Sequence, residues 1–487
     1  DEGSNSWFTN CWFSNNTASF TNATLHFSNV AAVMYPAIIS NCVFYGSGVA
    51  QNAIPIFEHA AEMTNHVIVS NCFYTNTLKY LYVETSPVLR IISNDQVSQL
   101  NIGKYFKHDA TNARWNIVMP QMMIASNTNT GALYFDLQSA VNGANDGNEI
   151  RVRDMVLTRG DEQLNALALT NGVFITNKNN LRIIGGYDAA FASVTGHSVL
   201  DGGGAALSNR LLYIANLTNL AMSNFVIQRG GSNAGTPSID GSGVLVSNIG
   251  FSLLSNIIVS NCVSRDGGGI NVVLCSNSVL SADVVRCTAS NNGGGVQLFR
   301  SRDTICSGTL GNNNALTYGG GLLLYYCSNI TVNAAIASNN GQYGGGVTLL
   351  WVTNSTMNST IASNYASGNG GGYYIYDGSG NTVNGLVTNN SAVVIGGGVS
   401  VEYTSNNIVN ADVVYNKCAF GGGISVYYAN DTTVNSIIAD NTATSESGGG
   451  IFMTCDLRSR IYATLLSNTA VASSGGGIAL LSSTNAI

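Results

Sequence analysis

Residues 319–326 read GGGLLLYY, residues 344–351 read GGGVTLLW, and residues 370–377 read GGGYYIYD. A triple glycine followed by apolar or aromatic residues occurs nine times, at steps of 25 to 27 residues. A fixed period of this size is typical of a repeat architecture, in which each unit buries its apolar residues only by stacking on its neighbours. The triplets, which we expect to form structural corners, begin at Gly267, Gly293, Gly319, Gly344, Gly370, Gly396, Gly421, Gly448 and Gly475.

Within each repeat, positions are counted from the first glycine, so that Leu322 is at position +3. Positions +3 and +5 are apolar in all nine repeats, as in Tyr373 and Ile375. Apolar residues two positions apart indicate a β-strand with one buried face. The unit is too short for a strand–helix–strand unit, which needs about 30 residues or more. The sequence therefore predicts an all-β fold, a parallel β-helix (solenoid) with about 26 residues per coil.

A second motif recurs later in the unit, where an apolar residue precedes an asparagine by three positions. Examples are Ile258 and Asn261, Ile336 and Asn339, and Leu386 and Asn389. Stacked asparagines form amide ladders, and asparagine also tolerates the left-handed backbone of tight corners. We expect these asparagines to lie above one another in successive coils.

The two motifs together resemble the repeats of the chlamydial polymorphic outer-membrane proteins, which carry GGA followed by an apolar residue, and F-x-x-N. More broadly the chain is similar to bacterial right-handed parallel β-helix surface proteins. The resemblance covers residues 241–487 and implies a right-handed coil and a location at the cell surface. This sequence departs from the family by having a third glycine in place of alanine, and Ile, Val or Leu in place of Phe.

The composition agrees with stacked coils and excludes some functions. Charged residues make up 9% of the chain, against roughly 25% in average domains, and stacked like charges repel. The net charge of −7, with 19 basic residues, argues against a nucleic-acid partner. The sequence has no apolar run of the 18 or more residues that a membrane-spanning helix needs.

Four segments are expected along the chain. Residues 1–87 carry coil signatures at Phe8, Ile39 and Val69, which are 31 and 30 residues apart, and residues 88–130 break the period as a closing segment or linker. Residues 131–240 are predicted to open the β-helix with a short capping helix near 136–144, for which Asp136 is the N-cap. Residues 241–487 form the regular repeats.

The two ends of the chain leave two explanations open. Coils precede the expected start of the β-helix, and the sequence stops at Ile487 within a coil. The chain is a segment of a longer surface protein, or a subunit that stacks head to tail on other copies through exposed strand edges, and the two explanations are compatible. Both explanations favour tandem continuation or assembly over a free, capped monomer.

The repeats carry no pattern typical of catalysis. Polysaccharide hydrolases need paired carboxylates on one face, but the acidic residues of the repeats fall at scattered positions, and none are aligned in adjacent coils. All five histidines precede the regular repeats. We expect no enzyme activity, no catalytic residues, no metal site and no cofactor.

An aromatic stripe is the candidate binding surface. Positions +6 and +7 should lie on the outer side of the coil, and they carry aromatic residues in several consecutive repeats. Such rows either stabilise the sheet by stacking across coils or stack on sugar rings or a neighbouring filament. The stripe consists of Phe299, Tyr325, Tyr326, Trp351, Tyr376, Tyr403, Tyr427 and Tyr428.

These observations favour an extracellular or cell-surface structural or adhesive β-helix that assembles with other copies of itself. The alternative is a carbohydrate-binding adhesin module that holds surface glycans on the aromatic stripe. A polysaccharide-degrading enzyme is the least favoured interpretation, because the paired carboxylates are missing.

Overall fold

The computed structural model divides into two compact units, residues 1–124 with 160–168 and residues 125–159 with 169–487. In the second unit the structure describes residues 125–134, 136–158, 172–188, 190–203, 210–231 and 240–483, and in the first it describes short strands between residues 7 and 117. Head-to-tail assembly and the four segment boundaries stay predictions.

The first unit contains strands that pair in parallel at one repeat step. Phe8 is paired with Ile39, and Ile39 with Val69. The strands form three sheets, the last of which is extended by an antiparallel pair, β10 and β11. Their bounds are β1 Trp7–Thr9, β4 Ala37–Ser40 and β7 Val67–Ser70; β2 Trp12–Ser14, β5 Val43–Tyr45 and β8 Phe73–Thr75; β3 Ala23–Ser28, β6 Ile54–His59, β9 Leu81–Val83, β10 Phe106–Asp109 and β11 Arg114–Ile117.

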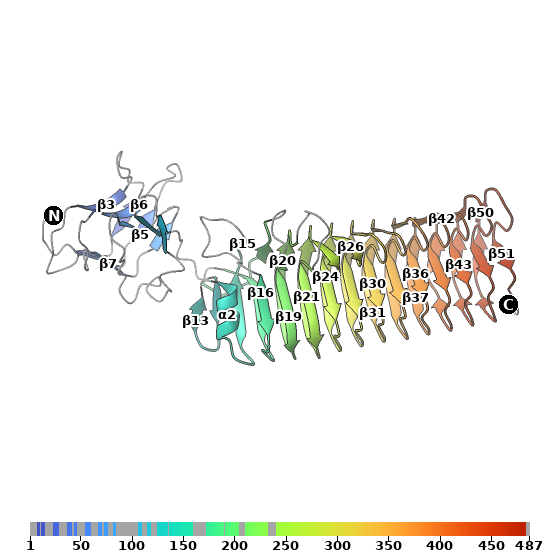
Figure 1. Ribbon diagram of the computed structural model, residues 1–487, viewed down its shortest axis with the longest axis horizontal. Coiled ribbons are helices and arrows are strands. Elements are labelled where there is room, and N and C mark those ends of the chain that lie inside the picture. Colours follow the sequence, from blue (N-terminus) through green and yellow to red (C-terminus); the bar gives the residue numbers. More distant parts are fainter. Residues whose placement is uncertain are drawn as a thin grey trace. The chain divides into compact units, whose positions relative to one another are not determined.

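The second unit is a parallel β-solenoid, as the repeats predicted. Residues one coil apart are paired in register, so that Leu322 pairs with Val347 and Val347 with Tyr373. Figure 1 shows the equivalent strands side by side along the stack. Among the described residues three sheets run along the unit, called sheets 1, 2 and 3 below, with 19, 12 and 9 strands.

Sheet 2 holds the strands that follow the glycine triplets, and sheet 3 holds the short strands that precede them. Sheet 2 consists of β16 Val173–Thr176, β19 Leu212–Leu217, β21 Val244–Ile249, β24 Ile270–Val273, β27 Val296–Phe299, β30 Leu322–Tyr325, β33 Val347–Leu350, β36 Tyr373–Tyr376, β39 Val399–Glu402, β43 Ile424–Tyr427, β47 Ile451–Thr454 and β51 Ile478–Leu481. Sheet 3 consists of β23 Val263–Asp266, β26 Thr288–Asn292, β29 Asn314–Ala315, β32 Asn340–Gly341, β35 Tyr365–Ala366, β38 Ser391–Ala392, β42 Lys417–Cys418, β46 Thr442–Ala443 and β50 Thr469–Ala470.

Sheet 1 lies between sheets 2 and 3 in chain order within each coil, and it opens with an antiparallel pair, β12 and β13. Its strands are β12 Ala125–Asn127, β13 Ala132–Tyr134, β14 Glu149–Arg153, β15 Val156–Thr158, β17 Arg182–Tyr187, β18 Ser198–Asp201, β20 Leu220–Gln228, β22 Ser252–Ser260, β25 Val279–Val285, β28 Ile305–Gly311, β31 Thr331–Ala337, β34 Thr356–Ala362, β37 Thr382–Thr388, β40 Ile408–Val409, β41 Asp412–Val414, β44 Thr433–Val434, β45 Ile437–Ala439, β48 Arg460–Ile461 and β49 Thr464–Leu466.

The predicted capping helix is confirmed as α2, Leu137–Gly143. The Asp136 carboxylate accepts a hydrogen bond of 2.7 Å from the backbone N–H of Ser139, as an N-cap does. The buried face of α2 packs on β12, β13, β14 and β16, the first strands of sheets 1 and 2. Within the described part of the chain, no helix is long and apolar enough to cross a membrane.

The core contains the residues that the strand period predicted. Positions +3 and +5 are buried in every repeat from Ile270 to Met453. The first glycine of each triplet has a positive φ, for example +67° at Gly370, and so turns the corner into sheet 2. A Cβ on Gly371 would lie 2.4 Å from the carbonyl oxygen of Gly397 in the next coil. Glycine is therefore required there by close approach.

A column of asparagines, all buried except the half-buried Asn468, forms a continuous hydrogen-bond ladder from Asn313 to Asn468. The Asn390 amide donates to Ile361 O at 2.9 Å and to Asn416 Oδ1 at 3.1 Å. Its own Oδ1 accepts from the backbone N–H and the side-chain amide of Asn364, both at 2.9 Å. Equivalent bonds link Asn313, Asn339, Asn364, Asn390, Asn416, Asn441 and Asn468.

The prediction was wrong for two of the asparagines expected in this column, because the column position is the next residue along the chain. Asn261 and Asn389 are exposed and have φ values of 52° and 55°, so they form corners. The column positions in their coils are Cys262 and Asn390, both buried. Neighbouring side chains of an extended segment point to opposite sides, so a shift of one residue exchanges a buried position for an exposed one.

Replacing Asn390 with Ala is expected to lower the free energy of unfolding by about 2–6 kcal/mol, because a buried N–H and a buried carbonyl lose their partners at about 1–3 kcal/mol each. The bonds lost are the two from Asn364 and those to Ile361 and Asn416. The shift of the urea midpoint measures the change. Asn389→Gly, at a positive φ that glycine adopts freely, serves as the matched control and should change stability by about 0.5 kcal/mol or less. Equal stability of the two variants would contradict the ladder's role.

Asp456 is a second buried polar group, and it stands at position +8, where other repeats have Ser301 and Ser483. Burial raises the pKa of this carboxyl, while Ser459 and nearby backbone amides act in the opposite direction. A carboxyl whose pKa is higher in the folded than in the unfolded state destabilises the fold once it ionises.

Asp456→Ser is therefore expected to stabilise the protein increasingly as the pH rises. The gain should begin near the unfolded-state pKa of about 3.9 and level off above the raised folded-state pKa, because only the wild type has to bury an ionised group there. Melting temperatures of both proteins between about pH 3 and pH 8 test this. A difference that does not vary over that range would rule out burial of the charge as its cause.

Candidate functional site

The candidate site lies on the outer face of sheet 2, over β30, β33 and β36. Position +4 in these strands points away from the core, yet Leu323 and Tyr374 are 0% and 5% exposed. They are covered because the residue before each glycine triplet folds back over the strand, so that Tyr318 and Tyr343 pack on this face. Thr348 fixes one such contact by donating to the carbonyl oxygen of Tyr343 at 2.7 Å.

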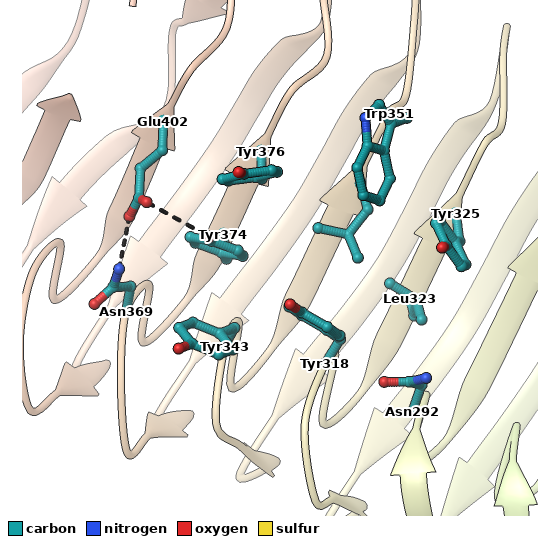
Figure 2. Close-up of a pocket in the computed structure, with 11 residues that line it drawn as sticks. Asn292, Tyr318, Leu323, Tyr325, Tyr343, Trp351, Asn369, Tyr374, Tyr376 and Glu402 are labelled. Atoms are coloured by element: carbon teal, nitrogen blue, oxygen red, sulfur yellow. Dashed lines mark hydrogen bonds between the residues drawn. The ribbon is translucent and has the colours of Figure 1, made fainter. Parts of the chain in front are cut away.

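Six aromatic rings surround this face in a continuous series, which we call the aromatic horseshoe. Each ring centroid lies 5.2 to 6.1 Å from the next, starting at Tyr318 and ending at Tyr325. Figure 2 shows Tyr325, Trp351 and Tyr376 in one row and Tyr318 and Tyr343 in another. In order, the horseshoe is Tyr318, Tyr343, Tyr374, Tyr376, Trp351 and Tyr325.

The horseshoe encloses an open groove of about 520 Å³. Leu323 and Leu350 form its apolar floor, and Asn292 lies at one end of it. Asn369 and Glu402 lie at the other end, beside Tyr374 (Figure 2). This volume is within the range of about 300–1,000 Å³ that small-ligand pockets occupy.

Glu402 is the charged group of the groove, and it is only 5% exposed. Its Oε1 accepts hydrogen bonds from the Asn369 amide and the Ser400 hydroxyl, both at 2.8 Å. Its Oε2 accepts one bond of 3.3 Å from the Tyr374 hydroxyl. Burial raises the pKa of Glu402, while the donors Ser400, Asn369 and Tyr374 oppose that shift.

The tyrosine hydroxyls supply further polar groups around the apolar floor. Burial is the main cause that raises the pKa of Tyr318, and the nearby phenols of Tyr343, Tyr376 and Tyr325 add to it. The pKa of Tyr374 is raised as well, by burial first and then by Glu402. These two phenols therefore stay protonated at neutral pH and can donate and accept hydrogen bonds.

Trp351 is held in place by backbone conformation and by a hydrogen bond. It stands at the corner that follows β33, with a positive φ of 51°, and its Nε1 donates to Asp377 at 2.7 Å. Among the described residues that line the groove none is basic. Arg300, whose guanidinium lies 5.0 Å from the Phe299 ring and 6.0 Å from the Tyr326 ring, is not part of the lining.

Of the eight residues in the predicted aromatic stripe, three line the groove and five lie outside it. Tyr325, Trp351 and Tyr376 line the groove. Tyr326, Tyr403 and Tyr428 lie outside it and are each 46% exposed, with Tyr403 and Tyr428 stacked at 5.4 Å. Phe299 and Tyr427 are half-buried; Phe299 contacts Tyr325 at 5.2 Å, and Tyr427 contacts Tyr428 at 4.7 Å.

Sequence reasoning missed the other half of the groove, namely Tyr318, Tyr343, Asn369 and Tyr374. The sequence feature that could have revealed this half is an apolar or aromatic residue at position +4, because an exposed outer face would carry a polar residue there. Leu323, Tyr374 and Phe452 break that alternation and are all buried. Glu402 was noted only as a scattered acid, because its partner Asn369 comes from a different part of the repeat.

Comparisons with known proteins add little to this geometry. No protein-family model matches the sequence. No curated protein matches it either. Among solved structures, PfbA, a surface adhesin of Streptococcus pneumoniae, is similar over 72% of this chain and 86% of its own, with 14% identity and a TM-score of 0.33. A likeness this distant carries no inference about function.

Proposed function

We propose that this protein is an extracellular adhesive β-solenoid that binds glycans in the groove enclosed by the aromatic horseshoe. The observation that carries the proposal is the combination of six aromatic rings around an apolar floor with a carboxylate–amide pair at one end. Aromatic rings offer apolar faces together with polar hydroxyls. Sugars match this arrangement, because their C–H faces are apolar and their edges carry hydroxyl groups.

The rigid scaffold supports a binding role. The horseshoe residues come from strands and corners held by the in-register pairing of β30, β33 and β36. A preformed site loses little conformational entropy when a ligand binds. Solenoids present extended surfaces of this kind to large partners, and glycans displayed outside cells are such partners, in keeping with an extracellular location.

We further propose that the groove binds its ligand without transforming it. Glycoside hydrolysis uses a pair of carboxyl groups, about 5–9.5 Å apart, across the scissile bond. Glu402 is the one carboxylate in the described lining of the groove. Asp377 is engaged by the Trp351 indole at 2.7 Å. A single buried carboxylate suits recognition of hydroxyl groups better than acid–base chemistry.

Replacing Trp351 with Ala is expected to weaken glycan binding at least about tenfold, which is about 1.4 kcal/mol, because one wall of the groove is lost. The binding screen uses oligosaccharide arrays followed by calorimetry on the best neutral binder. Tyr325→Ala, on the same row, should act in the same direction.

Tyr428→Ala is the matched control, since Tyr428 is exposed, belongs to the same predicted stripe and lies outside the groove. It should leave binding unchanged, and melting curves of all variants show whether they fold. Equal binding by wild type, W351A and Y325A would mean that the rings only stabilise the sheet by stacking.

A further inference from the structure

We infer that Glu402 and Asn369 set the specificity of the groove: they hold hydroxyl groups of a neutral sugar and exclude acidic sugars. This inference rests on the proposed glycan binding and adds the class of glycan to it. The two residues lie in adjacent coils at the closed end of the horseshoe, joined by the hydrogen bond from the Asn369 amide to Glu402 Oε1.

The hydrogen-bond arrangement leaves capacity for a ligand at one oxygen. An ionised carboxylate has about four acceptor positions. Oε1 of Glu402 receives two bonds of 2.8 Å, while Oε2 receives one of 3.3 Å from Tyr374. The Asn369 amide adds a second N–H and a carbonyl oxygen. The Glu402 carboxylate can accept from one sugar hydroxyl while the Asn369 amide N–H donates to the neighbouring hydroxyl, as a pair of adjacent hydroxyls requires.

The charge of the groove disfavours an acidic sugar. Glu402 is nearly buried, so a second carboxylate close to it would be repelled with little screening by water. No basic side chain in the described lining offers compensation. A uronic acid would therefore bring a second carboxylate close to Glu402, with no cation in the described lining to offset the repulsion.

The rings favour a neutral ligand over a cationic one. Cation binding by aromatic cages uses open ring faces. Tyr318 and Tyr343 stack on each other at 5.3 Å with an angle of 26° between their planes, so each ring partly covers a face of the other. Ring edges carry the positive end of the quadrupole.

The test compares the folded full chain and its E402Q variant on four probes: cellohexaose and chitohexaose as neutral sugars, chitosan hexamer as the amine, and hexagalacturonate as the acid. We expect the wild type to bind a neutral probe at least tenfold more tightly than hexagalacturonate. E402Q keeps the shape of the side chain and removes its charge, so this ratio should fall at least fivefold. A merely structural role for Glu402 would leave the ratio unchanged.

The outcomes separate this inference from the proposed function. Suppose that neutral-sugar binding requires Trp351, but the ratio of acid to neutral affinities is the same in E402Q and the wild type. The inference is then overturned, while the proposed function stands. Preference of the wild type for hexagalacturonate or for chitosan hexamer would also overturn it, and this readout needs no variant. If none of the probes binds, the proposed function fails, and the inference fails with it.

Discussion

The structure depends on in-register stacking, in which each residue lies over its counterpart one coil away at about 4.8 Å. Whatever occupies a position must tolerate a copy of itself or a complementary neighbour at that distance. Asparagine does so in the buried column, because its amide can donate to one neighbour and accept from the other. Charged residues satisfy this condition poorly, which explains why they make up 9% of the chain.

In-register stacking also produces the aromatic horseshoe and determines where the groove lies. Equivalent tyrosines in successive coils necessarily form rows, and Tyr318 and Tyr343 are one such pair. A groove arises only where the repeats differ, because identical rings in every coil would fill the space between the rows. Leu350 replaces a ring at position +6, and Glu402 ends the series. The residues that shape the groove for a ligand are therefore those that differ from the repeat pattern.

Much of the fold was predictable from local periodicity. The glycine corners, the buried positions +3 and +5 and the helix cap at Asp136 depend on residues that are close in sequence. The groove was predictable only in part. Tyr376 lies in a strand that the pattern located and Trp351 directly follows another, whereas Tyr343 comes from the corner before a glycine triplet. Alternation within one strand gives no information on a segment that folds back over its outer face.

The two most deeply buried carboxylates of the repeats differ in their surroundings. One only destabilises the fold when it ionises, whereas the other is suited to bind a ligand. Burial raises the pKa of both Asp456 and Glu402. Asp456 is fully enclosed, at a position where two other repeats have serine, so its charge has no access to a ligand. Glu402 instead lies at the end of a groove and has three side-chain donors, two of them from the adjacent coil. A carboxylate that is desolvated, held in place and open to a groove is suited to recognise hydroxyl groups, because its orientation is set before a ligand arrives.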